Sequence, residues 1–303
     1  MQPETRVQPN PPQADTYSFL PVWRSLALQL LILTSALLLI VLIGEFIQSR
    51  FETRIDRALS FALVALPLML WLYVSVLPES RVARPRRRLL GVAVVSALTA
   101  SAIGLPLVQD FFRVQEWLPL QSVLSRILGY TLTAGFADAG LKFIVLRYLI
   151  YPQGLRVRAD GIAYAFAGAL GYSGFLNFAV VWQLEPSWNV SAIYLLSNVT
   201  VQLASSMFIA LGIIESYFSD AHPLVLPINV LVAALSTGLI TGLVGGFMSG
   251  PLSTAGNTDR PLFAVALLGA SLILALGIVY FLYSNSERRE REAYMSQWNP
   301  NGI

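Results

Sequence analysis

Long apolar runs, separated by short polar segments, recur along the whole chain. A run of about 20 apolar residues is the length that an α-helix needs to cross the hydrocarbon core of a bilayer. A helix also satisfies its backbone hydrogen bonds within one segment, which lipid requires. We therefore predict an all-α polytopic membrane protein with about eight transmembrane helices. The predicted spans are Leu26–Ile43, Ala58–Leu77, Leu89–Val108, Ile127–Ile150, Gly161–Trp182, Ala192–Ile214, Leu224–Met248 and Leu262–Tyr283.

The segments outside these spans divide the chain into three parts. Residues 1–22 are rich in proline and poor in large apolar side chains, a composition typical of a flexible tail. Residues 286–303 include glutamates and arginines at helical spacings, which favours a short solvated extension of the last helix. We expect a single transmembrane helical domain over residues 23–285, with both tails in the cytoplasm.

The composition agrees with a membrane protein and narrows the chemistry. Hydrophobic residues make up 55% of the 303 residues and charged residues 12%, whereas soluble domains contain about 25% charged residues. The chain has no cysteine, which excludes disulfides and thiolate metal ligands. The net charge of +3 comes from basic residues that lie mainly in the loops between spans, so it does not indicate nucleic acid. The expected partners are the bilayer and a membrane protein.

Basic residues are distributed unequally between the two sides of the predicted membrane. Twelve lie in segments on the side of the N-terminus and six on the other side, and the densest group is Arg81–Arg88. Cytoplasmic loops normally carry the excess of lysine and arginine. We therefore predict a multi-pass integral membrane protein whose N- and C-termini are both cytoplasmic.

Small residues mark two of the predicted spans as packing surfaces. In the seventh span, glycines recur at four-residue intervals from Gly238 to Gly250, which places them on one helical face. Such a face lets a neighbouring helix approach closely, and in a large bundle we expect an internal contact. The fifth span is similarly rich in glycine and alanine, so we expect it to be central in the bundle.

One pair of charged residues interrupts the fourth predicted span. Asp138 and Lys142 lie four residues apart within the apolar run, and Lys142 is the only lysine of the chain. Charges inside a span are costly unless they face a partner, water or the bundle interior, so they are functional candidates. Two structural alternatives compete, because the two residues can neutralise each other and Lys142 can extend toward the interface. Other polar residues inside spans include Asn177, Asn198, Gln202 and Asn229.

Three motifs follow one another from this pair onward. They are Asp138-Ala139-Gly140-Leu141-Lys142, Asp160-Gly161-Ile162-Ala163-Tyr164 and Gly171-Tyr172-Ser173-Gly174-Phe175-Leu176-Asn177. In order and spacing these motifs resemble the core of the PrsW family of intramembrane metalloproteases, which is related to the CAAX and bacteriocin-processing membrane proteases. The resemblance covers about residues 134–212. It implies a helical membrane core, an intramembrane endopeptidase that uses zinc, and a place in the bacterial cytoplasmic membrane.

The chain departs from the family's pattern at the positions that would bind the metal. Where the family has a second glutamate, a glutamate before the asparagine and a histidine, this chain has Ala139, Leu176 and Gln202. Catalytic zinc needs about three ligands from His, Asp, Glu or Cys. The single histidine, His222, is predicted to lie in a turn between spans. We therefore assign no metal, no cofactor and no catalytic residue. The remnant positions of the site are Asp138, Lys142, Asn177 and Gln202.

These observations predict a non-catalytic pseudoprotease that acts by binding a membrane partner. One alternative is an active PrsW-like intramembrane metalloprotease, with zinc held by an unusual ligand set around Asp138. Another is a transporter or a subunit of a membrane complex, in which Asp138 and Lys142 exchange a proton. Metal binding, proteolysis and proton flux distinguish the three hypotheses.

Overall fold

A computed structural model describes most of the central part of the chain. In this part all regular secondary structure is helical, and four helices are long and apolar enough to cross a membrane. Their length and composition support a membrane protein. They are Leu89–Trp117, Asp160–Leu184, Val190–Phe218 and Val225–Val244. The described residues are 53–76, 86, 88–118, 121–151, 154–156, 158–186, 188–218 and 222–249, with Ser35 and single positions between 269 and 288.

Several sequence predictions fall on other parts of the chain. The predicted spans Leu26–Ile43 and Leu262–Tyr283 lie wholly or mostly outside the described residues, as do the tails at residues 1–22 and 286–303. The other six predicted spans all coincide with helical segments. The second span corresponds to α2 (Thr53–Trp71), which continues as the π-helical segment η1, Leu72–Val76.

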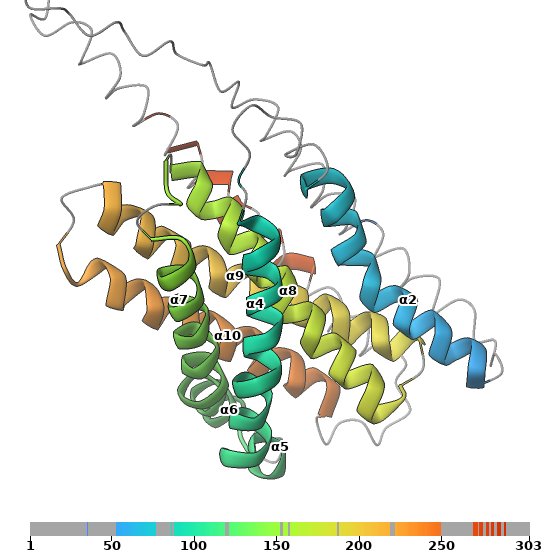
Figure 1. Cartoon of the computed structure of the whole chain (residues 1–303). Helices are drawn as coiled ribbons and strands as arrows, with labels where there is room; N and C mark the ends of the chain where they lie inside the picture. The colour runs from blue at the N-terminus through green and yellow to red at the C-terminus, as the bar shows by residue number, and fades with distance from the viewer. Residues whose placement is uncertain are drawn as a thin grey trace, which may run out of the picture.

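Two long helices form the centre of the bundle. α8 (Arg158–Leu184) and α9 (Trp188–Phe218) follow each other across a short turn and pack side by side (Figure 1). Within their apolar windows, 67% of α8 and 78% of α9 is buried, against 33% for α10 (Val225–Ser249). The expectation that the fifth span is central is therefore confirmed.

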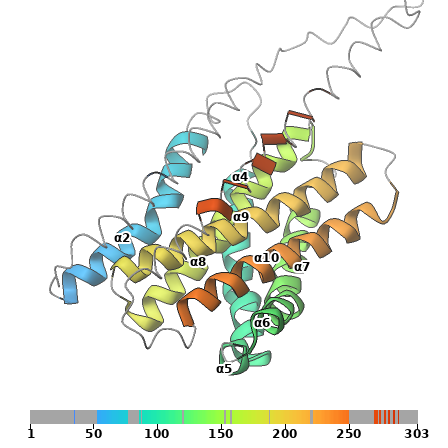
Figure 2. The same cartoon turned by 180° about the vertical axis from the view of Figure 1, so that it is seen from behind.

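Glycine explains how closely a third helix approaches α8. α4 (Leu89–Thr99) packs along α8, as both views of the bundle show (Figures 1 and 2). A Cβ atom on Gly171 would collide with the backbone of Ala93, and one on Gly168 would lie 3.2 Å from the Ser96 hydroxyl. Because only glycine leaves this space, the small residues of the fifth span set the distance between α4 and α8.

The glycines of the seventh span make an internal contact, as the sequence predicts. α10 packs against α6 (Val123–Tyr130) and against the π-helical segment η4 (Thr131–Gly135). Gly238 lies against Thr131, and a Cβ atom on Gly242 would lie 2.9 Å from the Ile127 side chain. The later glycines of this seam lie outside the positions whose surroundings the structure describes.

π-Helical turns interrupt two of the predicted spans. Residues Ala100–Gly104 (η2) and Leu107–Phe111 (η3) flank Pro106, which has no N–H to donate and so disturbs the regular helical bonding. In η4, the hydroxyls of Thr131 and Thr133 donate to carbonyls four residues earlier, each at 2.7 Å. The fourth predicted span is thus composed of three parts. These are α6, η4 and α7 (Phe136–Leu149).

Candidate functional site

Asp138 lies at a junction of three helices in the interior of the bundle. The hydroxyl of Tyr172 on α8 donates a hydrogen bond of 2.6 Å to Asp138 Oδ1. The side-chain amide of Gln202 on α9 donates one of 2.9 Å to Asp138 Oδ2. Both carboxylate oxygens on α7 are therefore held by neutral donors from other helices, which lowers the cost of burying the charge.

Lys142 is held one turn further along α7. Its ammonium group donates a hydrogen bond of 2.5 Å to the hydroxyl of Ser205 on α9. It also lies 5.2 Å from the centre of the Tyr172 ring, within the range of a cation–π contact. The Ser205 hydroxyl in turn donates to the carbonyl of Gln202 at 3.3 Å. We refer to these five residues as the polar cluster. Its members are Asp138, Lys142, Tyr172, Gln202 and Ser205.

The polar cluster is closed to its surroundings. The most exposed of its residues, Asp138, has only 6% of its surface accessible, and Ser205 has none. The expected neutralisation within one helix is only part of the arrangement, because the hydrogen bonds of Asp138 and Lys142 go to α8 and α9. Opposite charges one helical turn apart still attract each other in this interior. The expected extension of Lys142 to the interface does not occur, since its side chain is buried against Ser205.

Two π-helical segments border the polar cluster. η4 ends three residues before Asp138, and η2 places Gly104 directly against the Tyr172 hydroxyl. A Cβ atom at Gly104 would collide with that hydroxyl and lie 3.7 Å from Leu141. Single π-helical turns inside helices are frequent at functional positions. Here Gly104, the last residue of η2, leaves the space that the Tyr172 phenol occupies.

Asn177 forms a separate contact next to the polar cluster. Its side-chain oxygen accepts a hydrogen bond of 2.7 Å from Asn198, one helical turn before Gln202 on α9. Among the residues that the structure describes, three buried polar atoms beside this contact and the cluster have no hydrogen-bond partner. They are Asn177 Nδ2, Gln202 Oε1 and Ser206 Oγ. Buried polar atoms without a partner each cost about 1–3 kcal/mol, so they are points where a further polar group could bind.

The donor set of the polar cluster does not fit a catalytic zinc ion. Zinc needs about three ligands from His, Cys, Asp or Glu, and the cluster offers one carboxylate. That carboxylate already accepts two hydrogen bonds, and the ammonium of Lys142 beside it would repel a cation. Across the described ranges, no group of three or more such side chains is placed to hold a metal ion. The hydroxyls of Ser236 and Thr237 on α10 each donate to the carbonyl of Ala233 in their own helix.

His222 lies where the sequence places it, in the turn between α9 and α10. It is exposed, and its Nδ1 accepts a hydrogen bond of 3.3 Å from the backbone N–H of Leu224. This contact is a local turn interaction.

Asp160 has a different role from the helix cap that its position before Gly161 suggests. It lies inside the first turn of α8, and its carboxylate binds the Arg86 guanidinium at 2.6 Å. It also accepts from the backbone N–H of Arg156 at 3.0 Å. Asp160 is therefore not the N-cap residue, because it lies inside the helix, and its contacts join the segment before α4 to the segment before α8. Arg86 is correspondingly buried, with 4% of its side chain exposed, and is not a solvated loop charge.

Tyr172 and Ser205 are the site residues that sequence reasoning overlooked. Tyr172 enters the sequence analysis only as part of the third motif, and Ser205 is not singled out there. A signal was present, because Asn198, Gln202 and Ser205 recur at the spacing of one helical face. The direction of that face toward α7 is decided by packing.

The geometry thus brings together Asp138, Lys142 and Gln202 of the four predicted site residues and places Asn177 on a neighbouring contact. The resemblance to PrsW proteases remains a prediction from the sequence. The chain matches no protein-family model, no curated protein and no solved structure with which it was compared.

Proposed function

We propose that this chain is a non-catalytic pseudoprotease on a PrsW-like scaffold, which acts by binding a membrane partner. The observation that carries the proposal is the state of Asp138, whose two oxygens are both occupied by Tyr172 and Gln202. A carboxylate that activates water or binds a metal needs an open approach, and Asp138 is only 6% exposed with a donor on each oxygen. In this chain the same carboxylate ties α7 to α8 and α9.

The unpaired atoms beside the polar cluster support a binding role. Gln202 Oε1 and Ser206 Oγ lie one helical turn apart on α9, and Asn177 Nδ2 lies on α8. These atoms are as buried as Ser205, so the proposal requires the helices around them to separate when a partner binds, and a polar group of the partner would then remove their desolvation cost. We also propose the full eight-span topology, with both termini in the cytoplasm. It consists of the six predicted spans that coincide with described helices, together with the first and the last predicted span. Reporter fusions at the two termini test that topology.

The absence of catalysis can be tested on the purified chain and in cells. We expect less than stoichiometric zinc by elemental analysis after incubation with zinc, and no cleavage of a co-expressed single-span reporter. One zinc per chain that is lost in Asp138→Ala, or cleavage that is lost in the same variant, would establish the active metalloprotease instead. Proton flux in proteoliposomes that disappears in Asp138→Asn would establish the transporter.

The partner can be tested through Ser206, whose hydroxyl is buried and unpaired. Replacement of Ser206 by alanine should leave the stability of the free chain unchanged or slightly higher, because a costly unpaired group is removed. Chemical crosslinking in native membranes should capture a partner with the wild type and less of it with Ser206→Ala. Ser173→Ala is the matched control, since Ser173 is also buried but bonds to Leu170 in its own helix. Crosslinking of the chain only to other copies of itself would contradict the proposed membrane partner.

A second candidate function rests on the contact between Lys142 and Ser205. A lysine within hydrogen-bond distance of a serine is the arrangement of Ser–Lys hydrolases, in which the amine accepts the hydroxyl proton. The full burial of Ser205 places this candidate second, because a substrate carbonyl has no path to the hydroxyl. Labelling by a fluorophosphonate that disappears in Ser205→Ala and in Lys142→Met would reverse this order.

A further inference from the structure

A row of polar residues follows one face of α9, and each of them bonds to a neighbouring helix. They recur at intervals of seven, four and three residues, which is the spacing of one helical face. We call them the α9 polar stripe, which consists of Ser191, Asn198, Gln202 and Ser205. The first bonds to α2, the second to α8 and the last two to α7. α2 therefore covers the beginning of a stripe that leads to the polar cluster.

Ser60 joins α2 to the start of the α9 polar stripe. Its hydroxyl accepts a hydrogen bond of 2.9 Å from Ser191 and donates one of 3.3 Å to the carbonyl of Pro186. Both serines are buried. The ion pair between Arg57 and Glu185 lies at the same end of α2, but both of its side chains are about half exposed, so it contributes little. The serine pair is thus the buried polar link between α2 and α9.

α2 packs on the bundle along one narrow face. Both views show it at the edge of the described helices, beside α8 and α9 (Figures 1 and 2). Its opposite face is exposed at Ile55, Leu59, Met69 and Tyr73. The buried face consists of Ser60, Val64, Pro67 and Trp71. A helix that is held along one face can separate from its neighbours at a lower cost than a central helix such as α9.

The part of α8 that α2 covers carries Asn177. Phe61 of α2 packs against Phe178, with ring centroids 5.7 Å apart. One turn earlier on α8, a Cβ atom on Gly174 would lie 2.8 Å from the Leu68 side chain of α2. Asn177 belongs to the turn between these two contacts, and its Nδ2 is buried and unpaired. Separation of α2 from this turn opens the side of α8 next to Asn177.

Pro67 gives α2 a place to bend. It lies inside the helix and has no N–H to donate to the carbonyl of Leu63, four residues earlier. The helix then continues as the π-helical segment η1. Prolines and π-helical turns are the positions at which helices bend sharply. The part of α2 before Pro67 can therefore move while the part after it keeps its place.

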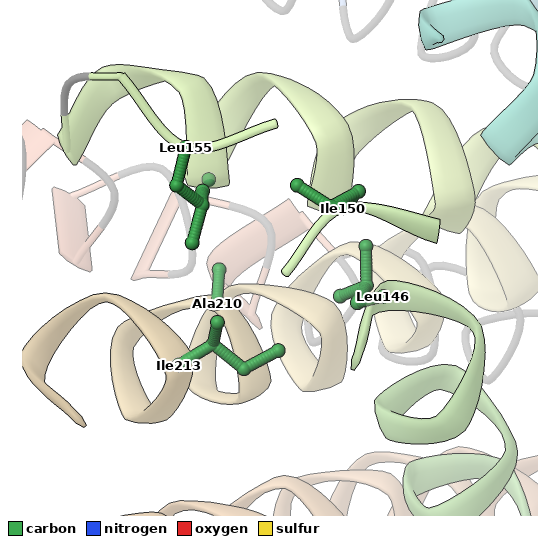
Figure 3. A pocket seen from close by; sticks show the side chains of 6 residues that line it. Leu146, Ile150, Leu155, Ala210 and Ile213 are labelled. Atoms are coloured by element: carbon green, nitrogen blue, oxygen red, sulfur yellow. The ribbon is translucent and has the colours of Figure 1, made fainter. Parts of the chain in front are cut away.

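The pocket shown in Figure 3 does not give a partner access to the α9 polar stripe. It lies between the end of α7, the connection that follows, the start of α8 and the second half of α9. It has room for about one water molecule, and only aliphatic side chains and a glycine line it. A polar group of a partner cannot enter there, so helices have to separate before such a group reaches the stripe.

We propose that the part of α2 before Pro67 is a lateral gate. It swings away from α8 and α9 and admits a polar group of a partner helix from the lipid to Asn177 and the α9 polar stripe. The partner is a transmembrane helix with a serine, threonine or asparagine that takes the place of Ser60 against Ser191. The gate rests on the proposed binding function, because it is the route by which the partner reaches the unpaired atoms.

The movement of α2 is tested first without a partner. The chain has no cysteine, so spin labels on Ile55→Cys in α2 and Leu231→Cys in α10, both exposed positions, report one distance in nanodiscs by double electron–electron resonance. We expect a main and a longer distance. The ratio of the longer to the main distance should rise about fivefold in Ser60→Ala, because one buried hydrogen bond is lost.

Ser236→Ala is the matched control for this measurement, because the Ser236 hydroxyl bonds within its own helix, and it should leave the ratio unchanged. A single narrow distance in both the wild type and Ser60→Ala would overturn the gate.

A disulfide then tests whether α2 is the route of entry. The hydroxyls of Ser60 and Ser191 are 2.9 Å apart, so Ser60→Cys and Ser191→Cys together can be oxidised to tie α2 to α9. The probe is a fluorescent polyleucine transmembrane helix with one central asparagine, and its binding in liposomes is measured by energy transfer. We expect binding about tenfold weaker to the oxidised protein than to the same protein after dithiothreitol. The all-leucine helix should show no such difference.

The outcomes separate the gate from the binding function. Equal binding of the asparagine helix by the oxidised and the reduced protein would overturn α2 as the route, although the chain binds a partner. If α2 opens and the reduced protein binds the asparagine helix no better than the all-leucine helix, the proposed binding function is contradicted, and the movement of α2 stands.

Discussion

The hydroxyl of Tyr172 lies 2.6 Å from Asp138 Oδ1, and this hydrogen bond joins α8 to α7 inside the bundle. The two residues are 34 positions apart, and both are buried. Without this hydrogen bond, Gln202 is the one remaining hydrogen-bond donor to this carboxylate among the residues that the structure describes. Removal of the Tyr172 hydroxyl therefore measures how much this hydrogen bond lowers the free-energy cost of burying the Asp138 carboxylate.

Replacement of Tyr172 by phenylalanine should destabilise the chain by about 1–3 kcal/mol, because Asp138 Oδ1 is left without a donor while the ring keeps its packing. Unfolding in mixed micelles with increasing SDS, followed by circular dichroism, measures the change. Tyr194→Phe is the control, since Tyr194 lies 42% exposed on α9 and should shift the midpoint little. Equal midpoints for the two variants would contradict the assigned role of the hydroxyl.

Gly104 should tolerate no side chain as long as Tyr172 is present. Replacement of Gly104 by alanine places a methyl group against the phenol and should cost about 1–3 kcal/mol. Combination with Tyr172→Phe should recover part of this loss, because the hydroxyl that collides is removed. Gly140→Ala is the matched control on α7, where a Cβ meets nothing within 4 Å, and helix propensity should make it neutral or stabilising. Additive effects in the double variant would argue against the contact.

Asp138 and Lys142 should show strong energetic coupling. Lys142→Met removes a positive charge beside the buried carboxylate, and Asp138→Asn removes the negative charge, so each single change leaves one buried charge uncompensated. The double variant should therefore be less destabilised than the sum of the two, with a coupling of about 0.5–3 kcal/mol. A double-mutant cycle of unfolding midpoints measures it. A coupling of zero would mean that the two charges are compensated separately.

The ion pair between Arg86 and Asp160 should be essential for stability. Asp160→Asn leaves the Arg86 guanidinium buried without its carboxylate and should cost about 3–5 kcal/mol. Glu185→Gln makes the same chemical change in an exposed pair, with Arg57 at 2.9 Å, and should cost at most about 1 kcal/mol. Similar losses in the two variants would show that burial adds nothing to the Arg86 pair.

The sequence by itself determined the helical class and much of the helix list. The six predicted spans that overlap the described residues coincide with helical segments, and four of these helices are long and apolar enough to cross a membrane, because length and hydrophobicity are local properties. The central place of α8 and the internal seam of α10 were also predictable, since glycine at helical spacing permits a close approach whatever the neighbour is. The exposed position of His222 in a turn was also predictable from the sequence.

The tertiary structure alone decided which side chains meet. Tyr172 and Ser205 reach the Asp138 and Lys142 pair from other helices, and Asp160 binds Arg86 from 74 positions away. The π-helical turn η2, and the contact of its Gly104 with the Tyr172 hydroxyl, also cannot be predicted from the apolar pattern. The physical reason is that the rotation of each helix about its axis depends on the packing of all its neighbours together. A period of 3.6 residues defines a face, and only the assembled bundle defines what that face touches.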